Sequence, residues 1–269
     1  MITTKTVNGV QIAFDDQGHE PGPVFVTLSG WAHDLRAYDG MLPYLRAAQR
    51  TVRVCWRGHG PDRNLVGDFG IDEMAADTIG LLDALEVDSF VPIAHSHGGW
   101  AALEIADRLG AQRVPAVMIL DLIMTPAPRE FVAALHGIQD PERWKEGRDG
   151  LVQSWLAGTT NQAVLDHVRY DSGGHGFDMW ARAGRVIDEA YRTWGSPMRR
   201  MEALAEPCAI RHVFSHPKIG EYDALHDDFA ARHPWFSYRR LGGETAFPGI
   251  ELPQQVAAEA IDLLAGARI

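Results

Sequence analysis

Short apolar runs alternate with longer amphipathic stretches along most of this 269-residue chain. The runs that predict strands lie at 4–7, 10–14, 24–28, 51–55, 90–94, 116–121, 209–214 and 236–241. Between them, residues 71–85 place five apolar side chains on one helical face: Met74, Ala75, Ile79, Leu82 and Leu85. Further helical patterns begin near Gly99, Glu221 and Pro253. Strands alternating with helices predict an α/β fold with a mostly parallel, doubly wound sheet.

One long segment breaks this alternation. From about Pro128 to Thr193 the chain carries helical patterns and three tryptophans, Trp144, Trp155 and Trp180, but no strand pattern. We therefore expect a core formed by residues 1–127 and 194–269, with a helical cap inserted at 128–193. Within the run 90–94, Pro92 cannot donate to a ladder, so we expect a bulge or local irregularity there.

The charge, the apolar runs and the cysteines limit which partners and which cellular compartment we expect. The formal net charge is -11 and no run of lysines or arginines occurs, so a nucleic-acid backbone or an anionic membrane would be repelled. The N-terminus lacks an apolar signal, and the apolar run 114–120 is too short to span a bilayer. We expect a cytoplasmic protein without nucleic acid or membrane partners. Cys55 and Cys208 lie in or beside strand runs, which predicts buried free thiols.

Residues 93–100, IAHSHGGW, place Ser96 between a predicted strand and a helix that opens on two glycines. A nucleophile elbow needs small residues two positions before and two after its serine, and Ala94 and Gly98 stand there. The start of the helix also offers backbone N–H groups to an anion. The pattern therefore favours an elbow over a serine that merely caps a helix.

A hydrolase triad on such a fold follows the order serine, acid, histidine. Asp121 ends the strand run 116–121 and is the candidate acid, although a loop aspartate that serves nearby backbone is the alternative. The histidine belongs between Leu241 and Pro253, and that loop contains none. The chain thus has an elbow and an acid without the expected base.

Five motifs carry a resemblance to a known family: LSGWAHD, WRGHG, AHSHGGW, ILD and TAFPGIELP. Together they resemble the cofactor-independent dioxygenases that open 3-hydroxy-4-oxoquinoline rings, a branch of the α/β-hydrolase superfamily. The resemblance runs end to end, although the cap matches only through scattered aromatic residues. It is strongest to the branch acting on 2-alkyl-3-hydroxy-4-quinolones such as the Pseudomonas quinolone signal. The family's last motif reads T-H-F-P, and Ala246 stands at its histidine position.

The resemblance implies a reaction of the quinolone with dioxygen that needs neither a metal nor another cofactor. It places the base at position 246, oriented by Asp121, and the oxyanion at the backbone N–H groups of Trp31 and His97. It makes Ser96 a hydrogen-bond partner of the substrate instead of a nucleophile. Five further residues are expected to line the pocket, with roles in the core or the cap interior as the alternative: His33, His95, Trp155, Trp180 and Ile187.

Three functions remain open at this point. The first is the ring-cleaving dioxygenase, with its base removed in this chain; we hypothesise an engineered histidine-to-alanine replacement at position 246, with natural loss as the alternative. The second is a serine esterase, which requires a histidine near Ser96. The third is a catalytically silent member that binds a small hydrophobic ligand. Oxygen uptake and carbon monoxide release with a 3-hydroxy-4-quinolone distinguish the first from the third, and a nitrophenyl ester tests the second.

Overall fold

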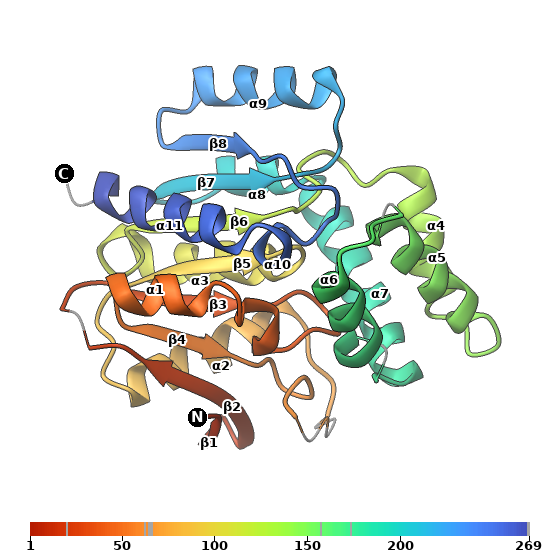
Figure 1. Ribbon diagram of the computed structural model, residues 1–269, viewed down its shortest axis with the longest axis horizontal. Helices are drawn as coiled ribbons and strands as arrows, with labels where there is room; N and C mark the ends of the chain where they lie inside the picture. Colours follow the sequence, from red (N-terminus) through yellow and green to blue (C-terminus); the bar gives the residue numbers. More distant parts are fainter. Residues whose placement is uncertain (20, 62, 64–66, 157, 173, 268–269) are drawn as a thin grey trace.

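The computed structural model describes residues 1–19, 21–61, 63, 67–156, 158–172 and 174–267, and its centre is one eight-stranded sheet (Figure 1). Across the sheet the strand order is β1-β2-β4-β3-β5-β6-β7-β8. The pairs β1–β2 and β2–β4 are antiparallel, and every neighbouring pair from β4 to β8 is parallel. In chain order the strands are β1 (Thr3–Val7), β2 (Val10–Gln17), β3 (Val24–Leu28), β4 (Thr51–Val54), β5 (Phe90–His95), β6 (Ala116–Leu120), β7 (Ala209–Phe214) and β8 (Phe236–Arg240). The expected mostly parallel sheet is confirmed.

Helices cover both faces of this sheet (Figure 1). Those that follow or precede strands of the sheet are α1 (Leu42–Ala48), α2 (Ile71–Ala84), α3 (Gly98–Arg113), α8 (Pro197–Glu202), α9 (Gly220–Arg232), α10 (Pro248–Glu251) and α11 (Pro253–Ala267). A short 3-10 helix, η1 (Leu35–Tyr38), follows β3. Because parallel strands need crossover connections, these helices are the expected consequence of the strand order.

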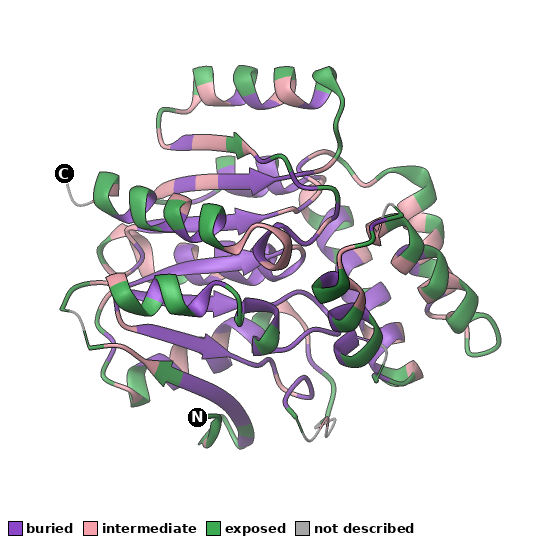
Figure 2. Cartoon of the chain, in the orientation of Figure 1, coloured by how far each residue is buried: buried purple, intermediate pink, exposed green. Residues whose placement is uncertain are grey.

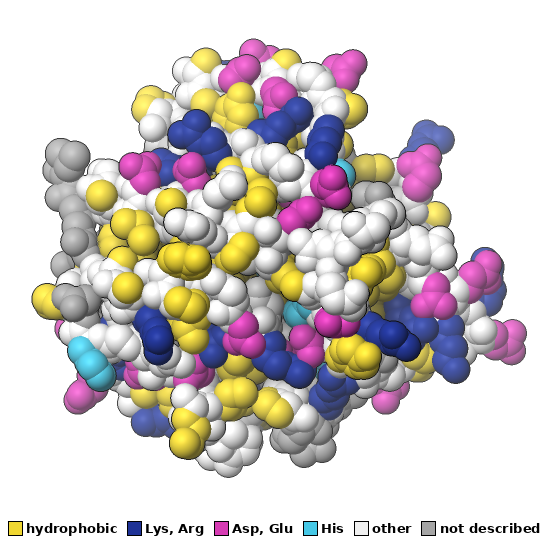
Figure 3. All heavy atoms as spheres, viewed as in Figure 1, with side chains coloured by type: hydrophobic (Ala, Val, Ile, Leu, Met, Phe, Trp, Pro, Cys, Tyr) yellow, Lys and Arg dark blue, Asp and Glu magenta, His cyan; other side chains and the backbone are white. Residues whose placement is uncertain are grey.

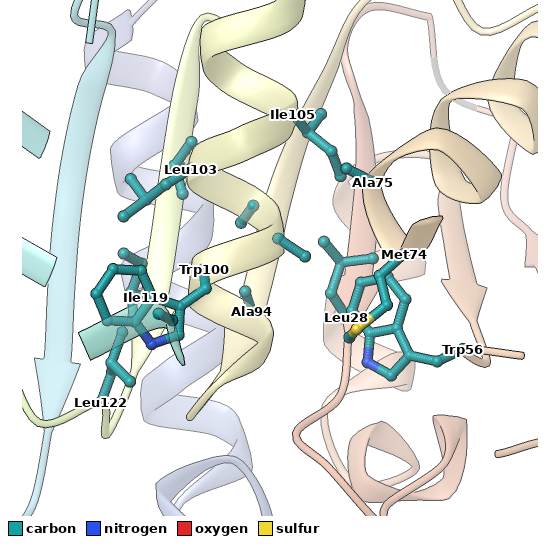
Figure 4. Close-up of a cluster of buried hydrophobic side chains, with 14 of the residues drawn as sticks. Leu28, Trp56, Met74, Ala75, Ala94, Trp100, Leu103, Ile105, Ile119 and Leu122 are labelled. Atoms are coloured by element: carbon teal, nitrogen blue, oxygen red, sulfur yellow. The ribbon is translucent and has the colours of Figure 1, made fainter. Parts of the chain in front are cut away.

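The central strands are apolar on both sides because both sides are covered. In β3, Val24, Val26 and Leu28 belong to a cluster shared with α2 and α3, whereas Phe25 belongs to the opposite cluster with α1 and α11. Figure 2 shows these strands buried over their length. Figure 4 shows part of the first cluster, in which the Trp100 ring of α3 lies close to Ile119 of β6. Burial on both faces therefore explains why the sequence of these strands is an almost continuous apolar run.

Local predictions can be compared with the structure one at a time. Asn8 and Gly9 form the turn between β1 and β2 with φ values of 50° and 80°, as a two-residue hairpin requires. The predicted helix 71–85 is α2. The expected bulge at Pro92 is wrong: β5 is continuous, and Pro92 pairs with Val26 of β3. The ladder to β6 starts only at Ile93, so the missing donor shortens one ladder without bending the strand.

Between β6 and β7 the described residues form helices and no strand. Those that precede α8 are α4 (Arg129–Gly137), α5 (Trp144–Leu156), α6 (Gln162–Asp166), the π-helical turn η2 (His167–Ser172) and α7 (Phe177–Trp194). They lie beyond the carboxyl ends of the parallel strands, on the right of Figure 1. We refer to residues 128–193 as the cap, keeping the boundaries proposed from the sequence.

Three further observations concern the surface charges, the helices and the cysteines. On the face shown in Figure 3, acidic and basic side chains lie next to one another. None of the helices in the described ranges is long and apolar enough to cross a membrane. Cys55 and Cys208 are buried free thiols, as predicted.

Candidate active site

Ser96 lies at the sharp turn from β5 to α3 and has a φ of 50°. This left-handed conformation is uncommon for a residue with a side chain, and it persists only when surrounding contacts hold it. The Ser96 N–H donates to Leu120 O at 2.7 Å, and its carbonyl accepts from Gly99 N–H at 2.9 Å. The turn is therefore the elbow geometry that the sequence predicted.

Gly98 shows why the elbow needs a small residue two positions after the serine. A Cβ atom added there would lie 2.6 Å from Ser29 O and 2.9 Å from Leu28 O, which is closer than real contacts allow. The start of α3 can approach the end of β3 only because this side chain is absent. Gly98 thus fixes Ser96 against the loop that carries Trp31.

One cavity of about 460 Å³ opens at the elbow. Its volume lies within the range of small-molecule sites. All ten residues that the sequence proposed for the site line this cavity: Trp31, His33, His95, Ser96, His97, Asp121, Trp155, Trp180, Ile187 and Ala246. The fold therefore brings the ten residues together, whatever role each one has.

Asp121 follows β6, also has a positive φ (47°), is half-buried and lines the cavity. Its Oδ2 accepts a hydrogen bond from Ser215 N–H at 3.0 Å. Loss of water around the carboxyl raises its pKa to about 7. The backbone N–H of His216 also donates to Asp121, but no imidazole does so among the hydrogen bonds of the described residues. The carboxylate is thus placed as an acid partner that has no imidazole.

The loop that carries Ala246 is held through its backbone. Ala246 N–H donates to Trp155 O of the cap at 3.2 Å, and Ala246 O accepts from His95 Nε2 at 2.7 Å. The carboxylate of Glu251 accepts from the Glu244 and Thr245 N–H groups and from the Thr245 hydroxyl at 2.9–3.0 Å. The position of residue 246 is therefore set without any contribution from its side chain.

The serine has no base. Within the described ranges, no hydrogen bond joins the Ser96 hydroxyl to a histidine, and none uses the N–H of Trp31 or of His97 as donor. The Nδ1 atom of His97 is buried and equally without a partner there. Unused donors that line a cavity can bind an anionic or carbonyl oxygen of a ligand. This arrangement suits oxyanion binding better than serine nucleophilic attack.

The cap supplies the apolar wall of the cavity. Trp155 of α5 stacks on Trp180 of α7, with ring centroids 6.3 Å apart, and Trp180 is only 2% exposed. Ile187 lies on the same helix as Trp180. The other apolar cap residues of the wall are Pro128, Phe131, Leu135, Ile138, Leu151 and Ala183. These side chains fit a flat aromatic ring with an alkyl substituent.

His33, His95 and His97 are buried and also line the cavity. For His33 and His95, a place in the core and a place in the pocket wall are therefore not exclusive. Burial lowers the pKa of His95 to about 4 and that of His97 to about 3, which leaves both rings neutral at pH 7. Burial and neighbouring histidines lower the pKa of His33 well below its usual value. No group of three or more His, Cys, Asp or Glu residues that could hold a metal ion occurs in the described ranges.

Four residues grouped around His33 were not predicted from the sequence. His167, Asp171 and Ser172 of η2 form a hydrogen-bonded group with His33. Phe247 lies edge-on to His33 with ring centroids 5.5 Å apart. Phe247 follows position 246 directly and could have been found from its place in the TAFPGIELP motif. The residues of η2 belong to a π-helical turn that has no sequence periodicity to mark it.

Comparison with known proteins agrees with this geometry. The profile of the alpha/beta hydrolase fold family matches residues 23–183. A 2-heptyl-3-hydroxy-4(1H)-quinolone dioxygenase from Mycobacteroides abscessus is 99% identical over 269 residues, which are 100% of both chains. The 1H-3-hydroxy-4-oxoquinoline 2,4-dioxygenase of Pseudomonas putida is 35% identical over 251 residues, covering 93% of this chain and 95% of that protein.

A solved structure shows the same agreement in three dimensions. It concerns recognition and ring cleavage of the Pseudomonas quinolone signal and contains the product. It superposes with a TM-score of 0.97 at 99% identity, covering 98% of this chain and 100% of that one. The chain therefore belongs to the α/β-hydrolase fold family and, within it, to the quinolone dioxygenases.

Proposed function

We propose that the reaction of this enzyme is the cofactor-independent cleavage of a 2-alkyl-3-hydroxy-4(1H)-quinolone by dioxygen. The substrate loses its 3-hydroxyl proton, and oxygen then bonds to C2 and closes onto C4. The O–O, C2–C3 and C3–C4 bonds break, so that C3 leaves as carbon monoxide and an N-acylanthranilate remains. The substrate itself supplies the electrons for oxygen, so the atoms and electrons balance without a further reductant.

The roles of the core residues follow from where charge develops in this reaction. A base at position 246 takes the hydroxyl proton, and Asp121 orients that base. The N–H groups of Trp31 and His97 stabilise the oxyanion at C4, since neither donates elsewhere in the described chain. Ser96 hydrogen-bonds the substrate and does not attack it. The cap wall, with Trp155, holds the bicyclic ring and its alkyl chain.

One observation carries the proposal: Asp121 lies at the cavity with a pKa raised to about 7, and within the described ranges no imidazole is hydrogen-bonded to it. A cationic imidazole at position 246 would favour the carboxylate and lower this pKa. A serine hydrolase needs the same histidine to activate Ser96, so its absence weakens the esterase alternative as well. The reaction named for the relatives, dioxygenation of a quinolone, then favours the dioxygenase.

We further propose that alanine replaces a histidine at position 246 and that the replacement is engineered. An identity of 99% to the quinolone dioxygenase of Mycobacteroides abscessus leaves only a few differing positions. The backbone hydrogen bonds of Ala246 tolerate this exchange, because neither involves the side chain. Such a variant holds unreacted substrate. The codon at position 246 of the parent gene decides between engineered and natural loss.

The test is Ala246→His, assayed with 2-heptyl-3-hydroxy-4(1H)-quinolone in air. We expect carbon monoxide release and oxygen uptake to rise roughly 10²- to 10⁴-fold, which is the usual effect of a positioned general base. The unsubstituted chain should bind the quinolone and turn it over slowly. Its residual rate should climb with pH, because alkaline solution ionises the hydroxyl that no base at position 246 ionises.

Two controls separate this proposal from the alternatives. A nitrophenyl ester should remain uncleaved by the present chain, since no base activates Ser96 there; in the chain carrying Ala246→His, ester cleavage without quinolone turnover would favour the esterase. Gas release that stays at the level of the unsubstituted chain at every pH, with folding intact, would show that Ala246→His restores no dioxygenase base. The ligand-binding function would then be favoured.

A further inference from the structure

A chain of buried polar groups leads from the cavity into the cap. His33, which lines the cavity, lies with its Nδ1 atom 2.7 Å from His167 Nε2. The Nδ1 atom of His167 lies 2.8 Å from Asp171 Oδ2. The other oxygen of Asp171 pairs with Arg36 at 2.7 Å, and the Arg36 side chain is 41% exposed. The proposed reaction uses none of these contacts.

The carboxylate determines which nitrogen of each ring carries a hydrogen. Asp171 can only accept while it is ionised, so His167 donates to it through Nδ1–H. His167 Nε2 then has a free lone pair and accepts from His33 Nδ1–H. The Ser172 hydroxyl oxygen lies 2.8 Å from the same His33 Nδ1 and, in this arrangement, accepts from Nδ1–H as well. The unprotonated nitrogen of His33 is therefore Nε2, which lies 3.4 Å from that hydroxyl. This leaves His33, a residue that lines the cavity, with Nε2 as its proton-accepting nitrogen.

We propose that His33 is a second proton acceptor for a ligand in the cavity, kept in its accepting tautomer by His167 and Asp171. This inference rests on the proposed quinolone substrate. The 3-hydroxyl O–H bond breaks and His33 Nε2–H forms, while His33 Nδ1–H moves to His167 Nε2. The positive charge then lies on His167 beside the Asp171 carboxylate. When the product leaves, the two steps reverse and a water molecule takes the proton.

The surroundings of His33 explain why the ring is neutral before a ligand binds. Several titratable or charged groups face it or its partners, from β5, the loops after β4 and before α7, η1 and η2: His95, His59, His175, Asp34, Arg36, His167 and Asp171. Burial disfavours a charge on His33, and any charge is stabilised only after it reaches His167. In this proposal His33 therefore passes the proton on to His167, and the positive charge does not remain on His33.

A second buried pair provides a matched control. His212 Nδ1 lies 2.8 Å from His226 Nε2, and both side chains are fully buried. His226 Nδ1–H donates to a backbone carbonyl, Tyr222 O, and not to a carboxylate. Neither ring lines the cavity. This pair has the geometry of the first without a carboxylate or access to a ligand.

The experiment measures the ionisation of bound ligand under nitrogen, where no turnover occurs. The present chain, His33→Gln, Asp171→Asn and His212→Gln are each saturated with 2-heptyl-3-hydroxy-4(1H)-quinolone. The absorbance of its ionised form is then followed against pH. An acceptor in the cavity favours the ligand anion, so His33→Gln should raise the ionisation midpoint by about one pH unit or more. Asp171→Asn should raise it less, and His212→Gln should leave it unchanged.

Each outcome decides between the two proposals. Equal midpoints for the present chain and His33→Gln, or an equally large rise with His212→Gln, overturn the role of His33 alone, provided that the quinolone binds. Failure of the quinolone to bind overturns both the proposed function and this inference. If His33→Gln does not fold, Asp171→Asn in η2 supplies the same comparison, and a midpoint equal to that of the present chain is then the contrary result.

Discussion

The two walls of the cavity are built differently. The core wall comes from residues that follow strand ends, and two of them, Ser96 and Asp121, have positive φ values that the neighbouring strands hold in place. The cap wall comes from helix faces, with aromatic and aliphatic side chains such as Trp155 and Trp180. From this comparison we expect the core wall to determine the reaction rate, and the cap wall to determine affinity and stability.

The largest effect should come from the core wall. In the chain carrying Ala246→His, Asp121→Asn should lower kcat on the order of 10²- to 10⁴-fold with little change in KM, because the imidazole loses its orienting carboxylate. Steady-state oxygen uptake measures this loss. The matched control is Asp121→Asn in the present chain, where no imidazole depends on Asp121. An equal loss in both chains would contradict the assigned role.

The next effect concerns the interior of the cap. Trp180→Ala should cost about 3 to 5 kcal/mol in free energy of unfolding, since Trp180 is almost completely buried between the cavity and the cap helices. Denaturant unfolding of the ligand-free chain measures this cost. A loss below about 1 kcal/mol would mean that the cap does not depend on Trp180 for stability, and the proposed division between the walls would fail.

A smaller effect is expected for ligand affinity. Trp155→Ala should weaken quinolone binding by about ten- to a hundredfold, as expected for one large apolar side chain lost from a ligand contact. Titration calorimetry with the present chain measures it without turnover. Trp144→Ala is the matched control, because Trp144 lies on the same helix α5 and does not line the cavity. Equal weakening by both changes would remove Trp155 from the binding wall.

The smallest effect is expected for Ser96. In the chain carrying Ala246→His, Ser96→Ala should lower quinolone turnover by at most roughly tenfold, the effect of losing one neutral hydrogen bond. A nucleophilic serine would behave differently, since its removal costs on the order of a millionfold. Abolished turnover, together with a trapped acyl group on Ser96 in the unsubstituted enzyme, would favour a hydrolase.

Much of the core wall could be predicted from the sequence because strand-end motifs are local. The glycines around Ser96 and the position of Asp121 after an apolar run specify the elbow and the acid without any tertiary information. The motif resemblance, not the pattern, identified Ala246 as the base position. The relation of His33 to His167 and Asp171 could not be predicted, because residues 134 positions apart meet only after the cap folds. The bulge predicted at Pro92 was wrong for a similar reason. The effect of its missing N–H donor depends on which strands lie beside β5, and the sequence pattern does not show this.

The backbone attachment of residue 246 has an evolutionary consequence. Its N–H is held by the cap and its carbonyl by His95, so the side chain can change while the loop stays in place. Under the proposed role of position 246, one codon change would therefore reduce catalysis strongly and leave a preformed binding site for the same ligand. A gene duplicate with such a change would bind that ligand from the start, without first passing through an unfolded or ligand-blind intermediate.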